Sequence, residues 1–128
     1  MKNILIISIF LLFVPLNSIA QANDNTKTGD ALIGEWTIDL RPTPESEEYF
    51  QSFVVQFIKE NTFEGTFYGS QLENSLLNRN WEKLYFAFTT KDQSNEYYHS
   101  GYLQNGKLFG ITYCPKREFA APWTGLKK

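Results

Sequence analysis

Apolar and polar residues alternate along most of the chain, which is the pattern of a β-strand with one buried face. The clearest case is the segment 81–90, where Leu84, Phe86 and Phe88 occupy every second position. Segments of this kind recur about every 10 to 14 residues between turn residues, and no stretch of helical period competes with them. The pattern therefore predicts an all-β protein.

Turn signals divide this alternating region into eight expected strands. They cover residues 32–40, 49–59, 62–70, 72–80, 81–90, 95–104, 107–114 and 119–126. Pro42 and Pro44 end the first strand and begin an exposed acidic loop, and Asn105-Gly106 is a two-residue hairpin turn. Eight short antiparallel strands joined by tight turns favour an up-and-down β-barrel, which leaves no free edge.

The alternation also predicts which side chains point into the barrel. Glu64 should face water, which places Phe63, Gly65 and Phe67 on the inner face of the third strand. In the second strand, Phe53, Val55 and Phe57 share one face. The other side chains expected to point inward are Leu84, Phe86, Phe88, Tyr97 and His99.

The N-terminal segment has the composition of a secretory signal peptide. Lys2 precedes an apolar run from Ile4 to Leu16, and cleavage is expected after Ala20 or Ala22. The run is about 13 residues, shorter than the roughly 20 that span a bilayer. The expected organisation is a cleaved signal peptide (1–22), a flexible polar tail (23–31) and one barrel domain (32–128) of a secreted or periplasmic protein.

Composition narrows the classes of function. The formal net charge is -2, with 12 basic and 14 acidic residues and no basic cluster, so a nucleic acid partner is not expected. Cys114 is the only cysteine, so no intrachain disulfide is possible, and we expect it to be a small apolar residue in a strand. The aromatic content of 16% must therefore supply much of the core.

Several short motifs resemble the calycins, the group that includes lipocalins and avidins. In those proteins a Gly-x-Trp motif in the first strand places a tryptophan across the closed end of the barrel. The matching features of this chain, in order, are Gly34-Glu35-Trp36, then Phe63-Glu64-Gly65-Thr66-Phe67, which is similar to the avidins' Thr-Gly-Thr-Tyr, then His99-Ser100-Gly101, which is similar to their Trp-Ser-Gly, and finally Trp123. The resemblance implies a calycin-like barrel in which Gly34, Trp36 and Trp123 are structural residues.

The same resemblance implies which residues face the cavity. Carried onto this chain, the avidin pattern directs inward Ile38, Phe67, Phe88, Tyr97, His99 and Tyr113. Biotin is not the implied ligand, because Ile38 and Pro42 stand where avidins place small polar groups. The lipocalins' closing arginine, which packs on the first-strand tryptophan, has Lys127 and Arg117 as candidates here.

The candidate reactive groups do not combine into a catalytic or metal site. His99 is the only histidine, and zinc requires three or four ligands. Cys114 follows the inward Tyr113 and should therefore face away from His99, so a Cys-His nucleophile pair is not expected. We therefore expect a protein that is not an enzyme and that holds no metal and no cofactor.

Two functions remain open. In the first, the barrel binds a small, partly apolar ligand among Phe67, Phe88, Tyr97, His99 and Tyr113, because apolar walls with a few polar groups are typical of such sites. In the second, the barrel is filled and the protein is an interaction module, such as a secreted protease inhibitor or an envelope structural factor, with the loop 41–49 as its contact surface. An open or a filled interior distinguishes the two.

Overall fold

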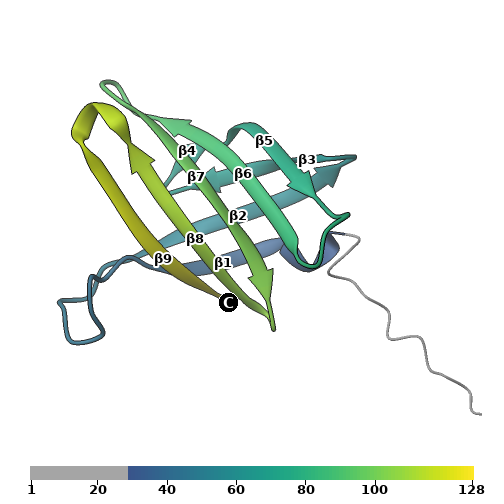
Figure 1. Cartoon of the computed structure of the whole chain (residues 1–128), viewed down its shortest axis with the longest axis horizontal. Coiled ribbons are helices and arrows are strands. Elements are labelled where there is room, and N and C mark those ends of the chain that lie inside the picture. The colour runs from purple at the N-terminus through teal and green to yellow at the C-terminus, as the bar shows by residue number, and fades with distance from the viewer. Residues whose placement is uncertain (1–28) are drawn as a thin grey trace, which may run out of the picture.

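The computed structural model describes residues 29–128, which form one curved antiparallel sheet (Figure 1). The elements in order are the 3-10 helix η1 (Asp30–Leu32), the strands β1 (Gly34–Asp39), β2 (Phe50–Lys59), β3 (Thr62–Phe67), β4 (Ser70–Gln71), β5 (Glu73–Asn78), β6 (Leu84–Lys91), β7 (Glu96–Gln104) and β8 (Lys107–Cys114), the 3-10 helix η2 (Pro115–Arg117) and the strand β9 (Phe119–Lys127). The predicted strand 62–70 divides into β3 and β4, because Tyr68 and Gly69 both have positive φ, at 54° and 77°. The described residues thus contain nine strands where eight were expected.

The strand order β4-β3-β2-β1-β9-β8-β7-β6-β5 is that of a nearly closed meander. β1 pairs with both β2 and β9, so the beginning and the end of the described chain lie side by side. At the seam, Ser75 of β5 bridges to β3, because its Oγ accepts from Phe63 N at 2.9 Å and donates to Phe63 O at 2.6 Å. The expected all-β antiparallel barrel is confirmed.

Inward side chains fill the space between the strands. The buried apolar residues are Leu32, Trp36, Ile38, Phe53, Val55, Phe63, Phe67, Leu72, Leu77, Leu84, Phe86, Phe88, Leu103, Leu108 and Trp123. The predicted inward positions of β3 and β6 are confirmed. The prediction that Phe57 shares the face of Phe53 and Val55 is wrong, because Phe57 is 46% exposed. The pairing of β2 with β3 shifts register between Val55 and Phe57, so Ile58 packs on the core in its place.

The start of β1 closes one end of the barrel. Trp36 is buried and its indole N–H donates to the carbonyl of Leu32 at 2.9 Å. The ammonium of Lys127 lies 5.2 Å from the centroid of the Trp36 ring and donates to the carbonyl of Ala31, so Lys127 rather than Arg117 packs on this tryptophan. Asp30 and Ala31, which the sequence assigns to the flexible tail, lie in η1.

The predicted signal peptide, 1–22, and most of the predicted tail lie outside the described residues. From residue 29 onward, none of the helices has the length and apolarity needed to cross a membrane.

Candidate functional site

Three of the five predicted ligand-binding residues meet inside the barrel. The His99 ring stacks on Phe88 with centroids 4.6 Å apart and lies 4.5 Å from the Phe67 ring. Phe88 also stacks on Phe53 at 5.1 Å, and Phe67 contacts Trp123 at 5.5 Å. These rings contact one another over the positions that a ligand inside the barrel would occupy.

Both ring nitrogens of His99 are hydrogen-bonded to buried threonines. Nε2 lies 2.8 Å from Thr90 Oγ1 and Nδ1 lies 2.7 Å from Thr112 Oγ1, while the indole N–H of Trp123 donates to the same Thr112 oxygen at 2.9 Å. Burial lowers the pKa of His99 from 6.5 to about 4, because the protein interior disfavours the charged imidazolium. His99 is therefore a neutral, hydrogen-bonded core residue at physiological pH.

Tyr97 is held by polar groups rather than by the packed rings. Its hydroxyl donates to Asp92 Oδ2 at 3.2 Å and accepts from Arg117 Nη1 at 3.1 Å. The Arg117 guanidinium also lies 5.3 Å from the centroid of Phe119. Tyr97 is half-buried and lies opposite the buried Thr90, on the same face of β7 as His99, but its hydroxyl belongs to a polar network outside the aromatic core.

The inward orientation expected for Tyr113 is wrong, as is the outward orientation expected for Cys114. Tyr113 is 45% exposed and stacks on Tyr98 outside the barrel, with centroids 5.0 Å apart, whereas Cys114 is fully buried. The cause is the β7–β8 hairpin register, which sets Tyr98 opposite Tyr113 and His99 opposite Thr112. Directly opposed residues share a face, so the inward His99 requires an inward Thr112 and an outward Tyr113.

Cys114 and His99 were expected on opposite faces of the sheet, and this expectation is wrong. Cys114 and His99 both face inward, but the two imidazole nitrogens bond to threonine hydroxyls rather than to the thiol. Within residues 29–128, no group of three or more His, Cys, Asp and Glu residues is arranged to hold a metal ion.

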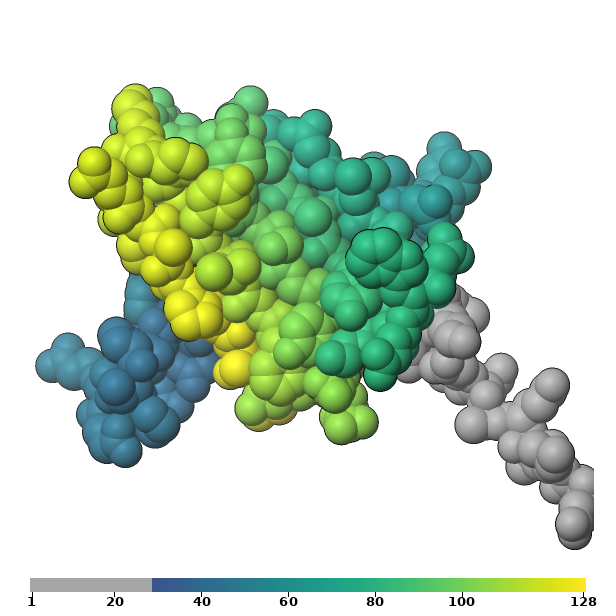
Figure 2. Space-filling view, in the orientation of Figure 1, coloured from purple at the N-terminus to yellow at the C-terminus, as the bar shows by residue number. Residues whose placement is uncertain are grey.

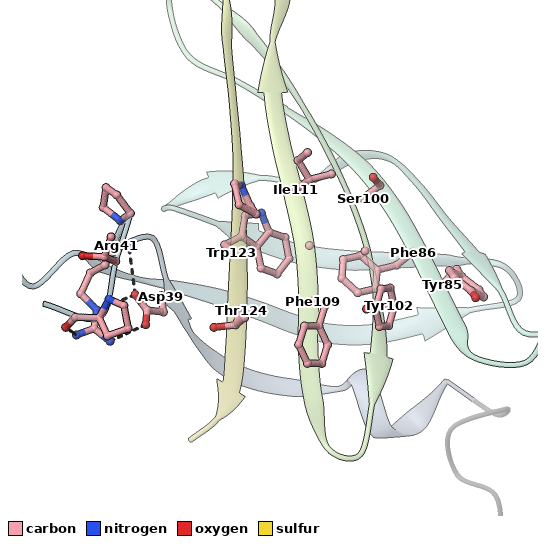
Figure 3. Close-up of a pocket in the computed structure, with 16 residues that line it drawn as sticks. Asp39, Arg41, Tyr85, Phe86, Ser100, Tyr102, Phe109, Ile111, Trp123 and Thr124 are labelled. Carbon is pink, nitrogen blue, oxygen red and sulfur yellow. Dashed lines mark hydrogen bonds and ion pairs between the residues drawn. The ribbon is translucent and has the colours of Figure 1, made fainter. Parts of the chain in front are cut away.

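A groove of about 710 Å³ lies on the outer face of the barrel (Figure 3). Strands β6 to β9 form its floor, and the start of the β1–β2 loop, residues 41–44, forms one wall. The residues along the floor and the aromatic wall are Tyr85, Phe86, Ser100, Gly101, Tyr102, Phe109, Gly110, Ile111, Pro122, Trp123 and Thr124. Figure 3 shows Trp123 between Asp39 and Arg41 on one side and Phe86 on the other.

Two glycines make the floor of this groove thin. The strand register places Phe86, Gly101, Gly110 and Trp123 opposite one another across β6 to β9. A Cβ on Gly110 would overlap the Trp123 ring, and one on Gly101 would come within 2.9 Å of Phe86. Because neither glycine has a side chain, the two rings lie directly against the inner side of the sheet and line the groove from beneath.

A row of aromatic side chains borders the groove on the outside. Tyr102 and Phe109 stack with centroids 5.3 Å apart, Tyr85 lies 6.0 Å from Tyr102, and Trp81 lies 6.0 Å from Tyr85. The Trp81 side chain is 69% exposed at the end of this row. The row is an apolar wall that rises from the sheet.

The opposite wall is fixed by a pair of charged residues. Arg41 donates to both carboxylate oxygens of Asp39, from Nε at 2.9 Å and from Nη2 at 2.7 Å, and its Nη1 donates to Pro44 O. The Arg41 side-chain hydrogen bonds lower the pKa of Asp39 to about 2. This pair holds the start of the loop beside the groove. In Figure 2 this loop, in dark blue, projects next to the yellow and green strands.

The sequence does not predict this groove, because the alternation and the calycin resemblance both direct attention to the inside of the barrel. One signal is nevertheless present: Tyr85, Tyr102 and Phe109 fall on the outer alternate positions of their strands, where polar residues are usual. A smaller outer hollow of about 300 Å³ adjoins the groove at Ser100 and is bordered by Tyr98 and Tyr113.

Comparison with known proteins gives no relative for this chain. No protein family matches it, and neither the curated proteins nor the solved structures contain a match. The barrel is compatible with the calycin architecture, and the calycin resemblance remains a resemblance in short motifs.

Proposed function

We propose that the protein is an exported, non-enzymatic interaction module that binds a segment of polypeptide in the groove on its outer face. The observation that carries this proposal is the contrast between the two sides of the sheet. The inner side is covered by aromatic rings in mutual contact, and the outer side holds a groove of about 710 Å³. This function is the second of the two that the sequence leaves open.

The packing of the interior argues against a ligand there. A small molecule between Phe67, Phe88 and His99 would have to separate rings whose centroids are 4.5 to 5.4 Å apart. It would also have to displace the threonine partners of His99 or leave them unpaired, at about 1 to 3 kcal/mol for each buried polar group. Rings packed in contact inside a protein do not separate without such costs.

The composition of the outer face supports a polypeptide partner. Exposed tyrosine and tryptophan side chains are enriched where proteins bind one another, and contiguous apolar patches on a monomer mark such surfaces. Ile111 and Tyr113 are 44% and 45% exposed beside the groove, and Trp81 extends the same surface. Pro42 and Pro44 add apolar rings on the opposite wall.

The loop that the sequence assigns to partner contact borders this groove. Its first residues line the wall, and the Asp39–Arg41 pair fixes them in place. The loop and the outer face of β6 to β9 therefore present one continuous surface to a partner.

Selection from a library of random displayed peptides on the immobilised protein tests the proposal. Peptides should be recovered that bind the wild type and lose binding to Ser100→Trp, which fills the groove from its exposed floor position. The matched control is Ser52→Trp on the outer face of β2, which should leave binding unchanged. Peptides that bind both variants equally, or no peptides at all, would contradict the proposal.

Native mass spectrometry of the protein purified from its own host tests the alternative. A mass equal to that of the polypeptide alone is the expected result. A small molecule retained in stoichiometric amount would instead favour a ligand inside the barrel, among Phe67, Phe88 and His99.

A further inference from the structure

Two lysines beside the groove, Lys83 and Lys107, form no ion pair within the described residues 29–128. The ammonium of Lys83 lies 4.4 Å from the centroid of Tyr102, and that of Lys107 lies 5.5 Å from the centroid of Phe109. Asp39 is paired with Arg41, Glu73 with Lys91 and Glu35 with Lys128, so none of these carboxylates is available to Lys83 or Lys107.

Asp39 is the one carboxylate of the groove lining, and Arg41 already occupies it. The pKa of Asp39 is lowered first by the hydrogen bonds from Arg41 and least by the charge of Lys107. The ammonium groups of Lys83 and Lys107 are therefore still able to pair with an acidic group that a partner brings.

The two lysines lie on the same side of the aromatic wall. Lys107 begins β8 and Lys83 directly precedes β6, each two residues along the chain from the wall residues Phe109 and Tyr85. Their stems therefore lean over the stacked rings, and the ammonium groups stand above the wall. The thin floor at Gly101 and Gly110 lies on the other side of the same wall.

The loop on the other side of the groove carries a surplus of negative charge. Arg41 is bonded to Asp39, and the charges of Glu48 and Glu45 raise the pKa of Arg41 further, after the larger effect of the Asp39 hydrogen bond. An acidic ligand group is therefore disfavoured at the loop and favoured at Lys83 and Lys107. The two walls of the groove thus differ in charge, with the loop wall negative and the aromatic wall positive.

We propose that the groove takes an extended polypeptide segment with an apolar side chain over Gly101 and Gly110 and an aspartate or glutamate at Lys83 and Lys107. This inference rests on the proposed function and names the chemistry of the partner. Lys107 and Gly110 are three positions apart on β8, and residues of a neighbouring extended segment have about the same rise of roughly 3.3 Å each. The acidic residue should therefore stand two or three positions from the apolar one.

Such a segment would bind on the face of the sheet, and this limits the interactions that can hold it. The segment lies over side chains and strand faces rather than along a strand edge, so it gains no ladder of backbone hydrogen bonds. Its affinity must come from the buried apolar side chain and from the charge pairs at the wall. The two contributions are then separable by substitution.

The experiment uses the peptides that the library selection recovers, measured by fluorescence anisotropy against Lys83→Met, Lys107→Met and the double variant. Methionine keeps the apolar stem that packs on the rings and removes the charge. The matched control is Lys59→Met, on β2 and outside the groove lining. We expect recovered peptides to carry an acidic residue two or three positions from an apolar one.

The double variant should weaken binding of these peptides about three- to tenfold, as expected for exposed charge pairs. Replacing the peptide's acidic residue by its amide should cause the same loss with the wild type and no further loss with the double variant. Raising the salt concentration should weaken wild-type binding more than binding to the double variant.

Failure of this inference is distinct from failure of the proposed function. Peptides that require an unfilled groove but lack an acidic residue, or that bind the lysine variants with unchanged affinity, would overturn the charge assignment and leave the groove as the binding site. Loss of affinity by independent, additive amounts in the lysine and peptide substitutions would also overturn it. Recovery of no groove-dependent peptide would overturn both.

Discussion

His99 and Thr112 lie directly opposite each other on β7 and β8, with Nδ1 and Oγ1 2.7 Å apart inside the barrel. Thr112 also accepts the indole N–H of Trp123, and Thr90 bonds the other imidazole nitrogen. Because these hydrogen bonds satisfy both ring nitrogens, a neutral histidine is tolerated among phenylalanine rings, whereas a charged one would be strongly disfavoured there.

Acid should therefore destabilise the protein through His99. The pKa of His99 is about 4 in the folded protein and 6.5 in the unfolded chain, so the unfolded state binds more protons between these values. The stability linked to neutral His99 is fully present above pH 6.5 and is lost as the pH falls to 4. The difference corresponds to about 3 kcal/mol at 1.36 kcal/mol per pKa unit.

Urea unfolding at a series of pH values measures this effect, with His99→Gln as the control. Glutamine keeps hydrogen-bonding groups and does not titrate, so the free energy of unfolding of the variant should change less between pH 6.5 and 4. Parallel pH curves for the two proteins would show that His99 is not the group responsible.

The thiol of Cys114 should be unreactive in the folded protein. Its side chain is fully buried, and alkylating or disulfide reagents need an accessible thiolate. Labelling in native buffer should be slower than in denaturant by a factor on the order of 10³, because it requires transient opening of the barrel. Tyr113→Phe is a suitable control, since it alters the exposed neighbour without opening the core. Rapid native labelling would contradict the burial of Cys114.

The orientation of Tyr113 shows how much of the fold can be predicted from the sequence. The hairpin turn Asn105-Gly106 is evident in the sequence, and counting back from it pairs His99 with Thr112, so local turn geometry predicts the correct face of β8. The wrong orientation of Tyr113 came from the resemblance to avidins. The exposure of Phe57 was not predictable in the same way, because simple alternation does not reveal a shift of register within β2.

The groove depends on relationships that no single segment contains. Its floor requires Phe86, Gly101, Gly110 and Trp123 to align across four strands, and its far wall requires the Asp39–Arg41 pair to hold a loop beside them. Strand alternation predicts each inner and outer face separately. It does not predict that two glycines stand opposite each other.

Substitution of Gly110 by alanine should destabilise the barrel. The added methyl would overlap the Trp123 ring, whose indole N–H is bonded to Thr112, so the ring cannot move away without breaking that hydrogen bond. Overpacking of this kind costs about 1 to 3 kcal/mol. Ser100→Ala, on the exposed face of the neighbouring strand, should change the free energy of unfolding by less than about 0.5 kcal/mol. Equal midpoints of thermal unfolding for the two variants would contradict the close packing of Trp123 on Gly110.

The Asp39–Arg41 pair should control the mobility of the loop rather than the stability of the barrel. Asp39→Asn removes the charge that Nε and Nη2 of Arg41 contact, so the loop 41–49 loses its anchor. Hydrogen–deuterium exchange of the loop amides should become several times faster, while the free energy of unfolding falls by less than about 1 kcal/mol, as for other ion pairs that water reaches. Glu73→Gln, which breaks the exposed pair with Lys91 on β6, is the matched control and should leave the loop amides unchanged. If loop exchange is the same in both variants, Asp39 does not hold the wall of the groove, and the residues 41–44 must be fixed by contacts of their own.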